Sequence, residues 1–201
     1  MKQFSEACQR NKQVILETIK PLLIDKKSVL EIGSGTGQHI VHFAQSLPHI
    51  QWQASDLMEN HPSINAWIAG SSARNILTPL ELDTTSNDWP NTKFDAVYSA
   101  NTAHIMPWNA VEAMFKGVAI ILSKQGLLML YGPFNYNGEF TSESNRQFEV
   151  WLKQVNPCRG IRDFEAVNLL AEQNGLRLED DFEMPANNRL LVWRKVLRET
   201  I

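Results

Sequence analysis

Cysteines are scarce in this chain, long apolar runs are missing and neither sign of charge dominates. Cys8 and Cys158 are the two cysteines in 201 residues, so the sequence offers no disulfide framework, and their spacing matches no zinc site. A single disulfide between them is compatible with the sequence, but unpaired thiols are the simpler interpretation. No apolar run approaches the ~18 residues that span a bilayer, and the first residues lack the apolar stretch of a signal peptide. We therefore expect a cytoplasmic protein that is not bound to membranes.

The charge balance argues against a nucleic-acid partner. Lys and Arg number 19 and Asp and Glu number 22, which gives a formal net charge of −3, whereas sequence-independent binding to nucleic acid needs a basic face. Hydrophobic residues make up 43% and charged residues 20%, values typical of a globular domain and unlike those of disordered chains. At roughly 150 residues per domain, we expect residues 1–201 to form a single domain.

Short apolar runs of strand type alternate with segments of helical periodicity. The helical segments repeat apolar residues every three or four positions, as in Ile40 and Phe43. This alternation predicts an α/β fold, with a Rossmann-like doubly wound sheet that is mainly parallel. The connection at 185–189 is too short for a helical crossover, so the last strand should be antiparallel. Trp67 and Trp151 fall on helical apolar stripes and are expected in the core. The seven predicted strands are 28–32, 50–54, 80–82, 94–99, 127–131, 176–184 and 190–196.

Three glycines, Gly33, Gly35 and Gly37, follow the first predicted strand and open a helix. Gly33 permits a tight turn, and Gly35 and Gly37 let a ligand approach the backbone where a Cβ atom would collide. Dinucleotide-binding loops need Gly or Ala at the position that Gln38 occupies here, and no lysine follows as in a P-loop. The loop therefore indicates a ligand without a pyrophosphate.

Carboxylates follow or end three neighbouring predicted strands, at Glu31, Asp56 and Asp83. Glu31, just before the glycine loop, would repel a pyrophosphate and attract an ammonium group. Asp56 can accept hydrogen bonds from both hydroxyls of a ribose, and Asp83 can accept one from an adenine amine. Asp56 could equally be a solvated acid or a helix cap, and Asp83 a turn cap. Together the three acids describe a ligand with an ammonium, a ribose, an adenine and no phosphate, which is S-adenosylmethionine (SAM).

These motifs resemble those of class I SAM-dependent methyltransferases, and the resemblance covers essentially the whole chain. It implies a seven-stranded sheet with an antiparallel last strand. In this resemblance Glu31 and the glycine loop contact the methionine part of SAM, Asp56 holds the ribose and Asp83 meets the adenine. A narrower resemblance, to a methyltransferase-like family of unassigned substrate, rests on the segments 33–39, 52–56, 100–108, 131–134 and 184–188. The implied cofactor-binding residues are Glu31, Gly33, Ser34, Gly35, Gly37, Asp56, Leu57, Asp83, Thr84 and Asn101.

His104 is the candidate catalytic residue. It follows the fourth predicted strand, where the resembled enzymes place residues near the transferable methyl group, so it could act as a general base. A structural histidine is the alternative. No set of residues indicates a metal site. The candidate substrate-binding residues are Asn11, Tyr131, Phe134 and Asn187.

The expected function is methyl transfer from SAM to an unidentified, small-molecule acceptor, with a protein acceptor still open. One alternative is an NAD-dependent dehydrogenase, against which Gln38 and Glu31 argue. The other is a SAM-binding sensor or partner-binding module that has the fold but no turnover. The sequence does not indicate the oligomeric state.

Overall fold

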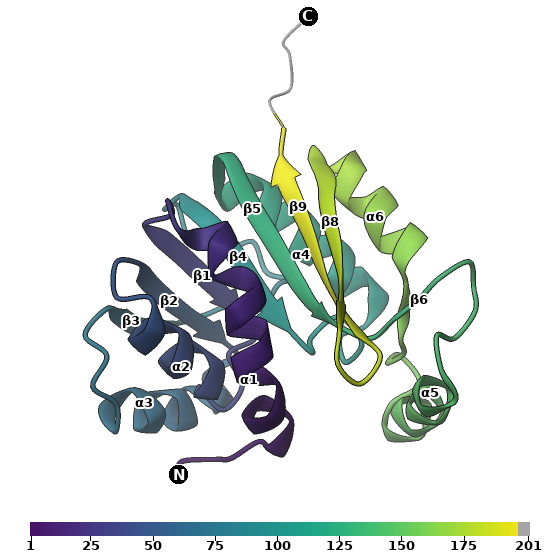
Figure 1. The fold of residues 1–201 in the computed structure, drawn as a ribbon, viewed down its shortest axis with the longest axis horizontal. Helices are drawn as coiled ribbons and strands as arrows, with labels where there is room; N and C mark the ends of the chain where they lie inside the picture. Colours follow the sequence, from purple (N-terminus) through teal and green to yellow (C-terminus); the bar gives the residue numbers. More distant parts are fainter. Residues whose placement is uncertain (197–201) are drawn as a thin grey trace, which may run out of the picture.

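A computed structural model describes residues 1–196, so the last five residues of the predicted domain 1–201 lie outside the described residues. The main sheet has seven strands in the order β3-β2-β1-β4-β5-β9-β8 (Figure 1). Strands β1 to β5 are parallel to one another, whereas β9 lies antiparallel between β5 and β8. The predicted doubly wound sheet with an antiparallel last strand is therefore confirmed. The strands are β1 (Ser28–Ile32), β2 (Gln51–Asp56), β3 (Ile76–Glu81), β4 (Phe94–Ala100), β5 (Leu122–Gly132), β8 (Leu176–Met184) and β9 (Asn188–Lys195).

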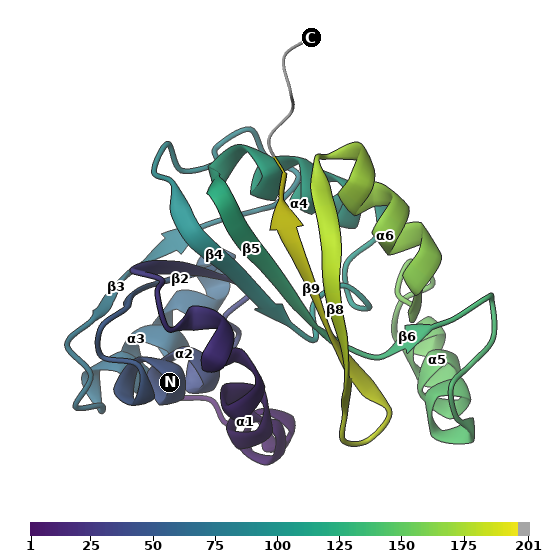
Figure 2. The ribbon, with the colours of Figure 1, turned by 45° about the horizontal axis from the view of Figure 1, so that its top comes forward.

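Helices cover both faces of this sheet (Figures 1 and 2). Helices α1, α2 and α3 lie on one face, α4 and α6 lie on the other, and α5 stands beyond the rim at which β4 and β5 end. The short strands β6 (Phe134–Asn135) and β7 (Arg162–Asp163) pair with each other on either side of α5 in the sequence. The helices are α1 (Glu6–Ile19), α2 (Gln38–Ser46), α3 (His61–Ala69), α4 (Trp108–Ile121), α5 (Glu143–Val155) and α6 (Phe164–Gln173), with single 3₁₀ turns at η1 (Pro21–Leu23) and η2 (Met58–Asn60).

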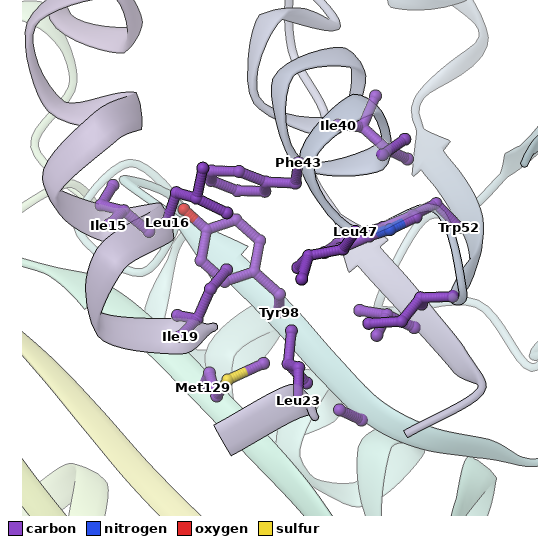
Figure 3. Close-up of a cluster of buried hydrophobic side chains, with 14 of the residues drawn as sticks. Ile15, Leu16, Ile19, Leu23, Ile40, Phe43, Leu47, Trp52, Tyr98 and Met129 are labelled. Atoms are coloured by element: carbon purple, nitrogen blue, oxygen red, sulfur yellow. The ribbon is translucent and has the colours of Figure 1, made fainter. Parts of the chain in front are cut away.

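Alternate residues of the central strands feed two separate cores. In β5, Leu127 and Met129 point to the core under α1 and α2, whereas Leu128 and Leu130 point to the core under α4 and α6. Alternation with period two is what a strand covered on both faces requires. In the first core, Tyr98 lies beside Phe43, with the two rings edge to face and 5.3 Å apart (Figure 3).

Two expectations about individual elements are wrong. Strand β3 begins at Ile76 rather than at residue 80, although Pro79 interrupts it. Proline removes one ladder donor, and β3 tolerates the loss because it lies at the edge of the sheet. Trp151 is 52% exposed instead of buried in the core, because α5 does not pack on the sheet. Trp67 is half-buried against the first core.

The strand order reverses between β1 and β4, which lie side by side in the sheet. From β1 the chain continues outward to β2 and β3, and from β4 it continues in the other direction to β5. Ligands of open α/β sheets bind beyond the carboxyl ends of the strands at such a switch point. Within residues 1–196, no helix is long and apolar enough to cross a membrane. Cys8 and Cys158 are both free thiols, in agreement with the simpler interpretation of the sequence.

Candidate functional site

A cavity of about 1290 Å³ opens at this switch point. Its walls come from the ends of β1, β2 and β4, from α1, from α5 and from the tip of the β8–β9 hairpin. Small-molecule sites typically measure about 300–1,000 Å³, so the cavity has room for a cofactor together with a second small molecule. The predicted site residues that line it are Asn11, Gly33, Ser34, Gly35, Asp56, Leu57, Asp83, Thr84, Asn101, His104 and Tyr131.

The glycine loop is fixed to the end of β2 by backbone hydrogen bonds. The amides of Gly33 and Ser34 both donate to the Ser55 carbonyl at 3.0 Å, and the Gly37 amide donates to the Ser34 carbonyl at 2.9 Å. The Ser34 hydroxyl accepts from the Ser55 amide, and the Ser55 hydroxyl donates to the Glu31 carbonyl. These hydrogen bonds hold the glycine loop against the end of β2.

The three glycines of the loop have three different surroundings. Gly33 has a φ of +72°, and a Cβ atom on it would lie 2.5 Å from Cγ2 of Thr102, so this position packs against the β4 loop. Gly35 has a φ of +56° and faces open space, with nothing within 4 Å of a Cβ position. Gly37 is packed against Ile64 of α3, at 2.9 Å from a Cβ position, and does not line the cavity. The structure thus leaves ligand approach to Gly35 and gives Gly37 a packing role.

Asp56, at the end of β2, binds the loop directly. Its Oδ2 accepts from the Gly35 amide at 2.6 Å, and its Oδ1 accepts from the Leu57 amide at 2.7 Å and from Asn60 Nδ2 at 2.8 Å. Since each carboxylate oxygen can accept two hydrogen bonds, Oδ2 retains one acceptor position. Asn60, which the sequence analysis did not single out, also lines the cavity and would have to release Oδ1 for a second ligand hydroxyl.

Asp83 follows β3 and caps its own turn, as the alternative interpretation of this residue proposed. Its Oδ1 accepts from the Thr85 amide at 2.9 Å and from the Thr85 hydroxyl at 2.7 Å, and these hydrogen bonds lower the pKa of the carboxyl. Its Oδ2 has no hydrogen-bond partner among the described residues, and Asp83 lines the cavity. Thr84 is buried and donates its hydroxyl to the Ala110 carbonyl at 3.1 Å, which ties this wall to α4.

Glu31 lies beneath the glycine loop and does not line the cavity. The residue is 2% exposed, and its Oε2 is buried and has no hydrogen-bond partner within residues 1–196. Burial raises the pKa of the Glu31 carboxyl to about 7; a hydrogen bond to Ser34 opposes this rise and the negative charge of Asp56 adds to it. In the same part of the chain, the buried hydroxyl of Tyr98 also has no hydrogen-bond partner. A carboxylate held in this state is one that a nearby cation would stabilise.

Helix α1 closes one side of the cavity through Asn11. The Asn11 Oδ1 lies 2.7 Å from His39 Nε2, and because an amide oxygen only accepts, Nε2 must carry the proton. Burial lowers the pKa of His39 to about 4, so this histidine is neutral and structural. The Asn11 side chain also forms a hydrogen bond with Tyr131. Burial raises the pKa of the Tyr131 hydroxyl, and this hydrogen bond opposes the rise. Asn11 and Tyr131 thus lie together in the cavity wall.

His104 and Asn101 lie where β4 ends. Asn101 adopts a left-handed backbone with φ of +59°, which Asn tolerates, and its side chain lines the cavity. His104 is 6% exposed and its ring makes no hydrogen bond within residues 1–196. Burial lowers the pKa of His104 to about 4, and the charges of Arg162 and Arg159 contribute to the decrease. The imidazole is therefore neutral at pH 7 and can accept a proton.

Arg162 holds the segment that carries His104. Its Nε donates to the Ala103 carbonyl at 2.9 Å, and its Nη2 donates to the carbonyls of Met106 and Cys158. Arg162 thus ties both ends of the 103–106 segment to the chain that follows α5.

Two of the predicted substrate residues are not brought to the cavity. Phe134 is 1% exposed and belongs to the core under α4 and α6, because β6 turns its side chain inward. Asn187 points to α5, where its Nδ2 donates to the Ser144 hydroxyl at 3.3 Å, while Ala186 and Asn188 line the cavity. Among the cavity residues that sequence reasoning missed are Phe148 and Trp151 of α5 and Arg159, which follows this helix.

Comparison with known proteins agrees with this geometry. A family model described as protein of unknown function (DUF938) matches residues 2–195. The chain belongs to this family. Among solved structures, it is similar to an O-methyltransferase family protein from Burkholderia thailandensis, with a TM-score of 0.85 and 13% identity over 96% of this chain and 59% of that one. It is also similar to human N-acetylserotonin methyltransferase in complex with SAM, with a TM-score of 0.79 and 14% identity over 96% of this chain and 53% of that one.

A third similar structure is a putative O-methyltransferase from Nostoc punctiforme, with a TM-score of 0.80 and 17% identity over 94% of this chain and 56% of that one. At these identities the similarity shows the fold. The DUF938 chain therefore has the methyltransferase fold that the sequence predicted, and it spans between about half and three-fifths of the length of these neighbours.

Proposed function

We propose that this DUF938 protein binds SAM in the cavity and transfers its methyl group to a small-molecule acceptor. The observation that carries the proposal is the open face of Gly35 beside Asp56, at the switch point of a methyltransferase fold. A similar structure is a methyltransferase of N-acetylserotonin, a small molecule, and was solved with SAM. This supports a small acceptor here.

The residues present fit SAM without a phosphate. Gly35 leaves space at its Cβ position, Asp56 retains an acceptor for a ribose hydroxyl, and Asp83 Oδ2 is free for an adenine amine. The unpartnered carboxylate oxygen of Glu31, beneath the loop, suits a cofactor with an ammonium group and disfavours a pyrophosphate. The dehydrogenase alternative therefore gains no support from the cavity.

When bound, SAM supplies a methyl group that is already activated for displacement. The protein then mainly has to align the acceptor, and good alignment can contribute about 7–11 kcal/mol to lowering the barrier. His104 would accept the acceptor's proton on a ring nitrogen as the new bond forms, because its imidazole is neutral at pH 7. General base catalysis of this kind is typically worth about 10²–10⁴-fold.

A SAM-binding module without turnover is the second candidate, and the low pKa of His104 favours it. A base with a pKa of about 4 takes a proton from an ordinary hydroxyl only at a large energetic cost, unless the acceptor changes its surroundings. Incubation with isotopically methyl-labelled SAM and a metabolite extract separates the two. Labelled products that disappear with Asp56→Ala support the enzyme, and SAM binding with no labelled product supports the module.

Calorimetry with SAM, S-adenosylhomocysteine and NADH tests the cofactor. Asp56→Asn should weaken S-adenosylhomocysteine binding about tenfold or more, because it removes a charged acceptor from the ribose and from the Gly35 amide. The matched control is Asp25→Asn, which removes an exposed carboxylate paired with Lys26 away from the cavity. Binding of NADH alone, or equal effects of the two variants, would contradict the proposal.

A further inference from the structure

Two arginines, Arg159 and Arg162, follow α5 three positions apart, and the structure uses them differently. Arg162 has its guanidinium bonded to backbone carbonyls. Arg159 lines the cavity, and within residues 1–196 its guanidinium forms no ion pair and no hydrogen bond. Its Nε is buried without a partner. The residue is half-buried, so its guanidinium is accessible from the cavity, and a cation without a partner in a cavity wall favours an anionic ligand.

Arg159 lies at the end of the cavity away from the acids. The cavity's carboxylates, Asp56, Glu59 and Asp83, follow β2 and β3, whereas Arg159 lies beside His104. The amide of the next residue, Gly160, donates to the His104 carbonyl at 2.9 Å, which fixes the two segments together. The cavity is therefore acidic beyond β2 and β3 and has Arg159 beside His104, while its other lining arginine, Arg10, comes from α1.

Aromatic rings line the end of the cavity at Arg159. His104 and Phe148 lie edge to face with ring centres 5.3 Å apart, and Phe148 stacks on Trp151 at 5.7 Å with the planes 13° apart. Trp151 is 52% exposed although it lines the cavity, so a large flat surface is open to a ligand. Exposed aromatic side chains of this kind stack on flat, apolar ring systems.

We infer that the methyl acceptor is an aromatic carboxylate, with its ring against Phe148 and Trp151 and its carboxylate on Arg159. The inference rests on the proposed function, because it names the acceptor of that reaction. A single guanidinium neutralises a single negative charge, and its planar edge matches the two oxygens of a carboxylate. Pairing with Arg159 would also offset one of the two charges that lower the pKa of His104. The acceptor would thereby make His104 a better base when it binds.

Calorimetry on the chain saturated with S-adenosylhomocysteine tests the inference with matched pairs. The probes are 4-hydroxybenzoate, 3,4-dihydroxybenzoate and 4-hydroxycinnamate, each against its primary carboxamide. At least one carboxylate should bind about tenfold to a hundredfold more tightly than its carboxamide, because a charge-assisted pair is lost with the amide. Arg159→Gln should remove the preference and Arg159→Lys should retain part of it. The control Lys153→Gln removes a nearby cation already bonded to Glu149 and Pro157, and should retain the preference.

Different failures have different meanings. A chain that binds no S-adenosylhomocysteine overturns the proposed function and this inference together. A chain that binds it, but binds each carboxylate no better than its carboxamide or binds no member of any pair, overturns the inference alone. If Arg159→Gln weakens S-adenosylhomocysteine binding by as much as carboxylate binding, Arg159 serves the cofactor's carboxylate and the inference is wrong.

Discussion

Replacing Glu31 with glutamine should stabilise the ligand-free chain above pH 7 and weaken its binding of SAM. Burial, as the main cause, raises the pKa of Glu31 from its ordinary value of 4.5 to about 7. At 1.36 kcal/mol for each tenfold change in proton affinity, this corresponds to about 3 kcal/mol. Because the folded-state pKa is raised, the carboxyl favours folding below pH 4.5, and that contribution is lost as pH rises through 7.

Above pH 7 the folded chain therefore carries an unpaired buried charge, which glutamine removes. We expect Glu31→Gln to gain about 1–2 kcal/mol in urea unfolding at pH 8, less than the full 3 because its own amide is also unpaired. At pH 5, where the wild-type carboxyl is mostly protonated, the gain should vanish. The control Glu17→Gln changes an exposed glutamate of α1 and should show no such difference between the two pH values. Lower stability of Glu31→Gln than of wild type at pH 8 would refute the reasoning.

The same carboxylate should make SAM binding depend on pH. The ionised fraction of Glu31 rises from about a tenth at pH 6 to about nine-tenths at pH 8, so the Kd for SAM should fall about tenfold over this range. Calorimetry at both pH values measures the Kd. The Glu31→Gln variant serves as the control, because it shows how much of the pH dependence comes from titration of SAM itself. A wild-type slope equal to that of Glu31→Gln would show that the charge of Glu31, beneath the loop, does not act on the bound cofactor.

Two further predictions concern the loop and the base. Gly35→Ala places a Cβ in open space but at a positive φ, so it should weaken S-adenosylhomocysteine binding at least tenfold and lower stability by about 1–2 kcal/mol. Gly33→Ala adds a collision with Thr102 to the same backbone strain, so it should unfold about 1–3 kcal/mol more easily than Gly35→Ala. Urea unfolding and calorimetry compare the two variants, and equal binding by Gly35→Ala and wild type would remove the loop from the site. His104→Gln should lower kcat about 10²–10⁴-fold with unchanged cofactor affinity. Wild-type kcat should decrease when the pH falls below the pKa of His104, which is about 4 and would be higher if a bound acceptor raises it. An unchanged kcat in His104→Gln would exclude His104 as the base.

The sequence predicted those parts of the fold that depend on local patterns. The alternation of apolar runs with helical stripes gave the sheet, and the short connection before Asn188 gave the antiparallel last strand. The glycine loop and Asp56 were found because a strand, a turn and a helix follow one another in the chain. Such signals reside in neighbouring residues, so a single sequence carries them.

The rest depended on tertiary packing. Gly35 and Gly37 look alike in the sequence, and only the position of α3 separates an open glycine from a packed one. Trp151 sits on an apolar stripe, but α5 stands away from the sheet and exposes it to the cavity. Nothing in the sequence distinguishes Arg159 from Arg162. Arg162 is bonded to carbonyls that lie 59 and 56 residues earlier in the chain, so its partners depend on the fold.

The central claim is that the acids and the open glycine at the switch point hold SAM. A crystal structure of the chain with S-adenosylhomocysteine tests it most directly. We expect the ribose hydroxyls on Asp56, the adenine beside Asp83 and the sulfur directed toward Asn101 and His104. A cavity that remains empty at saturating ligand, or a ligand bound elsewhere on the chain, would contradict it.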